Sequence, residues 1–329
     1  MLQKQKIVYF MTIFFAVLIL FTGCGRSDTA ARTETAFALD TVVRITVYSE
    51  KDVPAAQRAL ARCRDYEAVF SRTRPDSELS ALNAARGGTV SAELRAVLEC
   101  ALDISARSGG ALDITLGGVS TLYDFTAETP APPAAEDVAA ALAHSGMDGV
   151  ELAGSTLTLL DEHTVLDLGA VAKGSIADRL ADGLRADGVE HAIINLGGNV
   201  LCIGSRPDGS PFRVGVQVPE PGSTENAAEL SVRDGSVVTS GNYQRFFDYD
   251  GVRWHHILDP ETGFPVQNGL ASVTVTGPES LRCDALSTAC FVLGAEEGLA
   301  LIETMEGYEA LFLCSDGSAY RSTGFGAME

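Results

Sequence analysis

The sequence predicts an α+β fold in which helices pack on mixed or antiparallel sheets. Segments with helical apolar spacing alternate with β-branched segments, and several strand pairs need tight hairpins, most clearly at the Asp250-Gly251 pair. Because hairpins join antiparallel strands, these turns argue against a doubly wound parallel sheet. A chain of 329 residues that is 46% hydrophobic can bury a large core. We therefore expect two intimate subdomains with a cleft between them.

Each element is expected from a local pattern. Alternation of apolar and polar residues predicts an opening strand over 36–48, and helical spacing predicts a helix over 53–70. Ser77 and Ser91 are typical N-caps, so a short helix is expected after 77 and a longer one over 91–108. Further helices are expected over 134–146, 170–186 and 283–293, and further strands over 150–152, 157–160, 165–168, 192–195, 212–218, 236–239, 245–254, 272–276 and 310–314.

The N-terminus has the pattern of an export signal. Two lysines precede an apolar run over 7–22, which is short for a membrane span but typical of a signal-peptide core. The following Phe21-Thr22-Gly23-Cys24 resembles a bacterial lipobox, in which the cysteine becomes the lipid-modified first residue. We expect a signal peptide over 1–23, a flexible tether over 24–35 and a catalytic domain over 36–329. The chain is then a membrane-anchored lipoprotein on the extracytoplasmic face of a bacterial membrane; an uncleaved membrane anchor is the alternative.

Charge and cysteine spacing exclude several classes of partner. The net charge of −20 argues against nucleic acid and against an anionic membrane surface as ligands. An anionic ligand must therefore be met locally, by a few cations, a helix terminus or a metal. The cysteines after Cys24 form no C-x-x-C pair, which argues against zinc. Most are expected to be buried thiols, with one disulfide left open: Cys63, Cys100, Cys202, Cys283, Cys290 and Cys314.

A strand, a tight turn and a helix are expected around Gly169. The apolar run over 165–168 gives way after this glycine to helical spacing that continues through Lys173. A helix N-terminus with small residues suits phosphate groups, because it offers free N–H groups and a positive dipole end. The spacing matches neither the P-loop nor the G-x-G-x-x-G pattern. A corner that merely needs a glycine remains the alternative.

A pair of oxygen ligands lies at the start of the helix expected over 283–293. Asp284 and Thr288 are four residues apart and share one face of that helix. A carboxylate and a hydroxyl, with a backbone carbonyl, suit Mg²⁺ better than zinc or copper. The alternative is that Asp284 only caps its helix, and the two roles are compatible.

Two adjacent histidines end the strand expected over 245–254. Neighbouring side chains on a strand point to opposite faces, so at most one of His255 and His256 can share a site. His256 lies on the same face as Trp254 and is expected to be the inward one. Both a structural and a catalytic imidazole remain open for it.

The segments described above, together with several other short sequence blocks, resemble those of the ApbE family of FAD:protein FMN transferases. The resemblance extends over roughly 37–325 and includes the N-terminal half. The blocks that carry it, in the family's order, are Phe70-Ser71, Asp76-Ser77-Glu78-Leu79-Ser80, Gly110-Ala111-Leu112-Asp113, Asp167-Leu168-Gly169-Ala170-Val171-Ala172-Lys173-Gly174, Asn195-Leu196-Gly197-Gly198-Asn199, Thr239-Ser240-Gly241-Asn242-Tyr243, His256-Ile257-Leu258-Asp259-Pro260-x-Thr262-Gly263 and Asp284-Ala285-Leu286-Ser287-Thr288.

The resemblance implies an extracytoplasmic enzyme that splits FAD, joins FMN through its phosphate to a Thr or Ser of an acceptor protein, and releases AMP. It implies that Mg²⁺ is held by the Ala170 carbonyl, Asp284 and Thr288, and that His256, Asp284 and Lys173 act in catalysis. The implied FAD-binding residues are Leu39, Thr73, Ala111, Leu112, Asp113, Asp167, Lys173, Gly197, Gly198, Ser240, Gly241, His256 and Ile257.

Two positions depart from the family pattern. Asp40 stands where the family usually has glycine, and Thr73 stands where an aromatic residue is common. If a ring of FAD stacks at the second position, this chain lacks a contact worth about 0.5–1.5 kcal/mol.

The acceptor is expected to be another protein, by analogy a redox-pump subunit or an exported flavoprotein. The chain contains no stretch like the family's Ser/Thr-Gly-Ala-Thr acceptor motif. The alternative function is a lipoprotein that binds FAD, or hydrolyses it to FMN and AMP, without a protein acceptor.

Overall fold

The computed structural model describes residues 30–326, and the expected signal peptide, Cys24 and the first part of the expected tether lie outside them. The predicted α+β class is confirmed. One eight-stranded sheet, in which every pairing is antiparallel, forms the centre. Its strands, in spatial order, are β1 (Arg32–Ala38), β2 (Thr41–Val47), β6 (Ala192–Leu196), β7 (Asn199–Ile203), β10 (Ser236–Gly241), β13 (Leu270–Gly277), β14 (Glu309–Cys314) and β15 (Ala319–Arg321).

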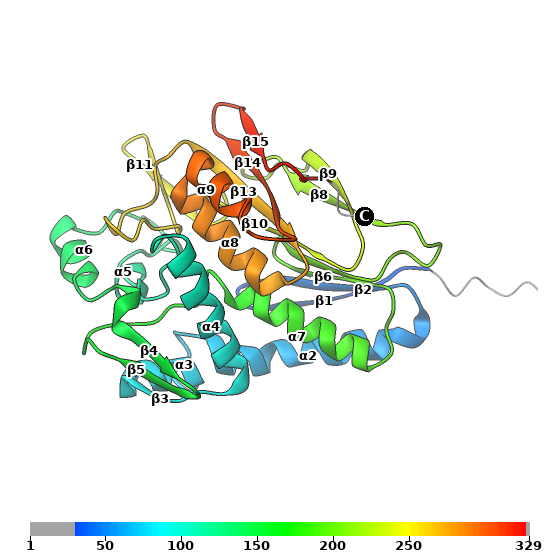
Figure 1. The fold of residues 1–329 in the computed structure, drawn as a ribbon, viewed down its shortest axis with the longest axis horizontal. Coiled ribbons are helices and arrows are strands. Elements are labelled where there is room, and N and C mark those ends of the chain that lie inside the picture. Colours follow the sequence, from blue (N-terminus) through cyan, green and yellow to red (C-terminus); the bar gives the residue numbers. More distant parts are fainter. Residues whose placement is uncertain (1–29, 327–329) are drawn as a thin grey trace, which may run out of the picture.

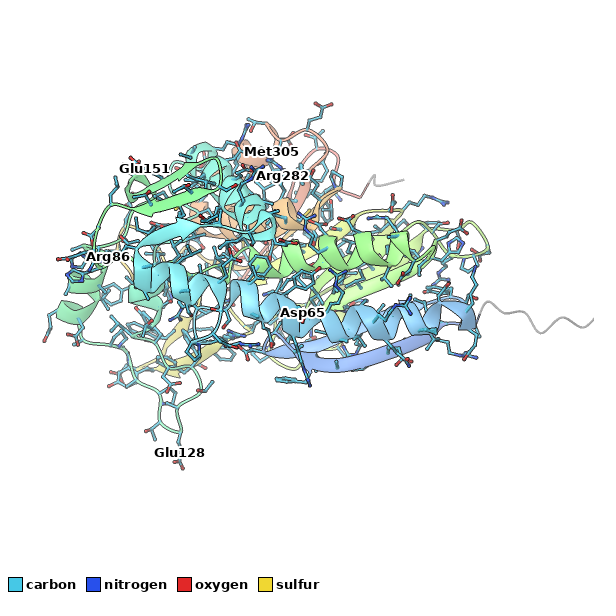
Figure 2. The ribbon with its side chains drawn as sticks, turned by 90° about the horizontal axis from the view of Figure 1, so that it is seen from below. Asp65, Arg86, Glu128, Glu151, Arg282 and Met305 are labelled. Carbon is cyan, nitrogen blue, oxygen red and sulfur yellow. The ribbon has the colours of Figure 1, made fainter. Side chains whose placement is uncertain are left out.

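One face of this sheet is covered by helices (Figure 1). They bury the main apolar core, because each helix turns its apolar side toward the alternating buried residues of the strands. Helix α7 (Ala172–Ala186) lies beside helix α2 (Val53–Phe70) along the length of the sheet (Figure 2). The helices are α2 (Val53–Phe70), α7 (Ala172–Ala186), α8 (Ser280–Leu293) and α9 (Ala295–Ile302), with α4 (Ala92–Arg107) packed outside α8.

Smaller units surround this core. The opposite face of the sheet is covered by the hairpin β8 (Phe212–Gln217) and β9 (Asn226–Val232), which buries a second apolar cluster. A three-stranded sheet of β3 (Gly87–Thr89), β5 (Thr156–Leu159) and β4 (Val150–Ala153) lies beside α3 (Glu78–Ala85). A third cluster joins α5 (Gly117–Ser120) and α6 (Ala135–Leu142) to the turn after the hairpin of β11 (Phe246–Tyr249) and β12 (Val252–His255). The short 3-10 helices are η1 (Glu50–Asp52) and η2 (Met147–Gly149).

The single opening strand predicted over 36–48 is wrong. The segment is a hairpin, because Leu39 and Asp40 both adopt positive φ angles (57° and 55°) and reverse the chain between β1 and β2. Strand β1 begins at Arg32, which pairs with Val47, so the last four residues of the predicted tether, 32–35, belong to this strand.

Other boundaries also differ. The run over 165–168 is not a strand and makes only one parallel bridge, between Leu116 and Val165. Helix α8 begins at Ser280 and α6 ends at Leu142. The six cysteines within 30–326 are free thiols, and all but Cys314 are buried. No helix within that range is both long enough and apolar enough to span a bilayer.

Candidate functional site

The site is organised by the crossing of α7 and α8. Gly174 is the third residue of α7, and a Cβ there would lie 2.4 Å from the carbonyl oxygen of Ser280. Only glycine therefore lets the first turns of the two helices come this close. At the crossing, the Gly174 N–H donates to Oδ2 of Asp284 at 2.8 Å. The structure thus brings Asp284 to the first turn of α7, as the sequence suggested.

Asp284 does not cap its own helix. It lies in the second turn of α8, is 4% exposed and keeps Oδ1 without a hydrogen-bond donor among residues 30–326. Burial raises the pKa of Asp284 to about 6, and the nearby charge of Lys173 and the Gly174 N–H oppose that rise. A buried carboxylate with one free oxygen is a strong ligand for a cation.

The Thr288 hydroxyl is oriented by a chain of hydroxyl groups. Ser287 Oγ donates to the Asp284 carbonyl at 2.9 Å, so its single hydrogen is used. Ser240 Oγ, 2.8 Å from Ser287 Oγ, must then be the donor in that pair. Thr288 Oγ1, 3.2 Å from Ser240 Oγ, is left to donate to it. This order leaves the lone pairs of Thr288 free to bind a ligand.

The turn before α7 supplies a third oxygen. The Gly174 N–H bonds to Asp284, and no N–H or O–H within 30–326 donates to the Ala170 carbonyl. The expectation that the whole helix start is open to phosphate needs correction, because the Ala172 N–H donates to Leu168 and the Gly174 N–H to a carboxylate. The N–H groups of Ala170 and Lys173 have no acceptor within the described part of the chain.

The histidine assignment also changes. His255, not His256, is the inward imidazole, since it is 1% exposed. Its Nδ1 accepts from the Ile257 N–H at 3.3 Å, so its Nε2 donates to the Val266 carbonyl at 2.9 Å. Both ring nitrogens are used, and burial lowers the pKa of His255. It is therefore a structural residue.

His256 is half-buried and faces the cation of α7. Its Nδ1 lies 3.4 Å from the Arg245 carbonyl and is the donor in that contact, which leaves Nε2 as an acceptor. Desolvation first, and then the charge of Lys173, lower the pKa of His256 to about 3. Lys173 itself makes no ion pair within 30–326, although it acts electrostatically on both His256 and Asp284.

In the turn around Gly169 that precedes α7, Asp167 is held by residues that the sequence analysis does not identify. Asp167 Oδ2 accepts from Arg72 Nε at 3.0 Å and from Ser120 Oγ at 2.9 Å, while Oδ1 accepts from the Gly169 N–H at 2.9 Å. Arg72 also donates from Nη1 to Thr121 Oγ1 at 2.7 Å. No local motif marks Arg72; only its place beside Thr73 in the loop after α2 hints at a role.

The segment Ala111–Asp113 reaches the same corner. The Asp167 N–H donates to the carbonyl of Ile114 at 2.7 Å, which places the end of this segment beside Asp167. Asp113 accepts from the Thr115 N–H at 2.7 Å, and burial raises its pKa despite that bond. Thr73, in contrast, is exposed and contacts only Ser71 through hydrogen bonds.

Two hairpin turns form another edge of the candidate site. Gly197 and Gly198 make the turn between β6 and β7 with φ angles of 65° and 100°, and a Cβ on Gly197 would lie 2.2 Å from Thr41 Oγ1. This turn therefore packs against the β1–β2 turn, where the Leu39 N–H donates to Glu67 at 2.7 Å. Asp40 Oδ2 lies 3.9 Å from an Nη atom of Arg245. The φ angle of Asp40 is positive, a conformation that glycine adopts without strain, which explains why glycine can occupy position 40.

The remaining implied residues are Ser240, Gly241 and Ile257. Ser240 and Gly241 end β10, and a Cβ on Gly241 would lie 2.4 Å from the Tyr243 ring. Ile257 is buried, and its backbone supports His255. The contacts described connect Asp284 to the start of α7 and Asp167 to Arg72 and Ser120, whereas Thr73 bonds only to Ser71.

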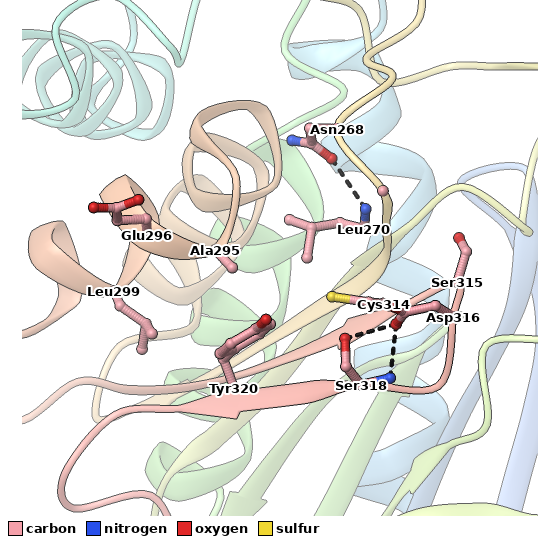
Figure 3. Close-up of a pocket in the computed structure, with 11 residues that line it drawn as sticks. Asn268, Leu270, Ala295, Glu296, Leu299, Cys314, Ser315, Asp316, Ser318 and Tyr320 are labelled. Atoms are coloured by element: carbon pink, nitrogen blue, oxygen red, sulfur yellow. Dashed lines mark hydrogen bonds between the residues drawn. The ribbon is translucent and has the colours of Figure 1, made fainter.

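A separate cavity of about 670 Å³ lies between α9, the β14–β15 hairpin and the loop at Asn268 (Figure 3). Its walls include Leu299, Cys314 and Tyr320. It contains none of the residues expected to bind a ligand.

Comparisons with known proteins find relatives that cover almost the whole chain. A family model described as the ApbE family matches residues 39–312. The FAD:protein FMN transferase of Treponema pallidum (strain Nichols) is 35% identical over 346 aligned residues, which cover 98% of this chain and 96% of that relative. The solved ApbE protein of Thermotoga maritima has a TM-score of 0.83 at 30% identity and covers 91% of this chain and 99% of its own. The flavin transferase ApbE of Vibrio cholerae has a TM-score of 0.81 at 28% identity, over 90% of this chain and 98% of that one. This chain therefore belongs to the ApbE family.

Proposed function

We propose that this protein transfers FMN from FAD to a Ser or Thr hydroxyl of an acceptor protein and releases AMP, with Mg²⁺ as its metal. The observation that carries the proposal is the group of free oxygens at the α7–α8 crossing, with the unpaired Lys173 ammonium nearby. The family's curated relatives, which bear the name FAD:protein FMN transferase, support it.

The donor set fits magnesium. Asp284 Oδ1, the Thr288 hydroxyl and the Ala170 carbonyl are all hard oxygens that no donor within 30–326 occupies. Within 30–326 no cluster of three His, Cys, Asp or Glu side chains could hold a metal, so a softer ion finds no such site there. Bound Mg²⁺ would neutralise charge on the pyrophosphate and favour departure of AMP.

The chain's own residues would bind and orient the substrate. Lys173 would pair with a phosphate oxygen of FAD, because no carboxylate in the described part of the chain forms an ion pair with it. In an in-line displacement, the acceptor oxygen bonds to the FMN-side phosphorus as the bond from that phosphorus to the AMP oxygen breaks. The acceptor proton would go to Nε2 of His256 or to a carboxylate near the metal.

Covalent transfer distinguishes this function from its alternative. Purified protein is incubated with FAD, Mg²⁺ and an acceptor that carries a Ser/Thr-Gly-Ala-Thr motif, and the denatured acceptor is weighed. The expected gain is the mass of FMN less one water. Release of FMN and AMP with an unmodified acceptor would instead support the FAD-hydrolysing lipoprotein, and bound but intact FAD would support a carrier.

We also propose that the protein works on the extracytoplasmic face of a bacterial membrane, anchored by a lipid on Cys24. The apolar run over 7–22 and the lipobox-like residues that follow support this location. Its acceptor is then a redox-pump subunit or an exported flavoprotein. Membrane fractionation of wild-type protein and of Cys24→Ala tests the anchor, since only the wild type should remain in the membrane fraction.

A further inference from the structure

Helix α8 starts against a carboxylate that belongs to α7. The N–H groups of Ser280 and Leu281, the first two of α8, donate to Oδ1 and Oδ2 of Asp178 at 3.0 and 2.9 Å. The preceding residue, Glu279, makes no side-chain capping bond. Two of the free donors of this helix start are therefore satisfied from the neighbouring helix.

This contact mirrors the one at Asp284. Gly174 and Asp178 are four residues apart on α7, and Ser280 and Asp284 are four apart on α8. Each pair lies on one face of its helix, so the two helices meet through two reciprocal contacts one turn apart. Two contacts at this spacing fix both the separation and the rotation of α8 relative to α7.

We propose that Asp178 is a positioning residue for the metal site: by holding the first turn of α8 it sets where Asp284 Oδ1 and the Thr288 hydroxyl lie relative to the Ala170 carbonyl. This inference rests on the proposed function, because it needs Mg²⁺ at those oxygens. It concerns a residue that touches neither the metal nor FAD.

The chemistry of the contact favours positioning over simple capping. Asp178 makes no ion pair within 30–326, and it is half-buried near the acidic side chains of Glu279 and Asp182, so its charge is costly there. A neutral cap on α8 itself would satisfy the helix at lower cost. A carboxylate that binds two successive N–H groups instead holds the orientation of the helix start.

The test compares Mg²⁺ binding in three variants of the full metal-free protein. Asp178→Asn keeps the shape but can accept only one of the two N–H groups, and Asp178→Glu keeps the charge but displaces it by one methylene. Ser91→Ala is the matched control, because Ser91 caps α4 through the Leu94 N–H at 3.2 Å and takes no part in the α7–α8 crossing.

Calorimetric titration with Mg²⁺ alone and thermal unfolding without metal give two independent readouts. We expect both Asp178 variants to bind Mg²⁺ about 10- to 100-fold more weakly, the usual effect of losing a residue that orients a ligand. Ser91→Ala should lower the unfolding temperature but bind Mg²⁺ like wild type. In activity assays, Asp178→Asn should need more Mg²⁺ for half-maximal rate, with the KM for FAD unchanged at saturating Mg²⁺.

Wild-type Mg²⁺ affinity in both Asp178 variants, with only a lower unfolding temperature, would show that Asp178 is a structural cap and would overturn the inference. If Asp178→Asn does not fold, Asp178→Glu decides by the same two measurements. Absence of Mg²⁺ binding in the wild type itself would overturn the proposed metal site, which is a different result.

Discussion

Asp178 and Asp284 cap each other's helices: the first accepts from the start of α8 and the second from the start of α7. The reciprocal arrangement leaves one oxygen of Asp284 free beside the Thr288 hydroxyl. A helix crossing thus becomes a candidate ligand site.

Asp284→Asn should fold but lose function. The amide oxygen can still accept from the Gly174 N–H, so we expect the free energy of unfolding to change by less than about 1.5 kcal/mol. Removing the charge should abolish Mg²⁺ binding and lower FMN transfer at least 100-fold. Asp284→Ala should lose transfer as well, and full activity in either variant would contradict the proposed mechanism.

Gly174→Ala should separate the two helices. Its Cβ would meet backbone atoms of Ser280 and Leu281 that cannot rotate away, so a loss of about 1–3 kcal/mol is expected in urea unfolding. Mg²⁺ affinity should fall with it. Gly183→Ala on the same helix is the control, because its Cβ would meet only the flexible end of Arg62 at 3.3 Å. That substitution should be neutral or stabilise by about 0.5–1 kcal/mol.

Ser240→Ala should misorient Thr288. Without the Ser240 acceptor, the Thr288 hydroxyl is free to turn its hydrogen toward the metal position, so we expect Mg²⁺ affinity to fall about 3- to 10-fold. Thr239→Val is the matched control. Thr239 lies on β10 next to Ser240, but its hydroxyl pairs with that of Thr274 on β13 and with no residue of α8 within 30–326. Equal Mg²⁺ affinity in Ser240→Ala and wild type would show that the hydroxyl chain does not orient the ligand.

The stability of the metal-free protein should depend on pH through Asp178. Burial raises the pKa of this carboxyl from 3.8 to about 6, although the two N–H donors oppose the rise. Between about pH 4 and 6 the folded protein then holds a proton that the unfolded chain releases, so the free energy of unfolding falls as pH rises.

Chelator-treated wild type should therefore lose on the order of 1–3 kcal/mol more than Asp178→Asn across this pH window. Urea unfolding at several pH values measures the difference. Asp284 is present in both proteins, so its contribution to the pH dependence cancels from the difference. Parallel stability curves for the two proteins would show that the Asp178 pKa is not raised.

Thr73→Tyr should strengthen FAD binding. Thr73 is exposed in the loop whose neighbour Arg72 holds Asp167, so a larger ring can be added there without entering the core. A stacking contact worth about 0.5–1.5 kcal/mol corresponds to a 2- to 12-fold lower Kd, measured by flavin fluorescence. Thr73→Val, which adds no ring, should leave the Kd unchanged.

Much of the fold could be read from local patterns. Helix α2 was predicted residue for residue, because its apolar spacing is regular and a loop rich in turn residues follows it. The hairpin at Asp250-Gly251 was found because that pair is a strong turn signal. The β1–β2 hairpin was missed because Leu39 and Asp40 form its turn with positive φ angles, and leucine rarely does so.

The parts that could not be predicted depend on contacts distant in sequence. The start of α8 was placed three residues late because its capping group comes from Asp178, about one hundred residues earlier. Which of the two histidines points inward depends on where β12 ends, at His255, and on the Val266 carbonyl that accepts from the His255 ring. Arg72 carries no motif, and its importance follows only from its bonds to Asp167 and Thr121.

If Cys24 carries the proposed lipid, the early start of β1 would limit how far the enzyme can stand from a bilayer. Arg32 is eight positions after Cys24, and an extended chain spans at most about 3.4 Å per step, or about 27 Å in all. With a lipid on Cys24, the start of β1 could then lie no farther from the lipid headgroups than this extended length. Acceptor hydroxyls held close to the same membrane surface would then be reached most readily, and those on tall extracellular domains would not.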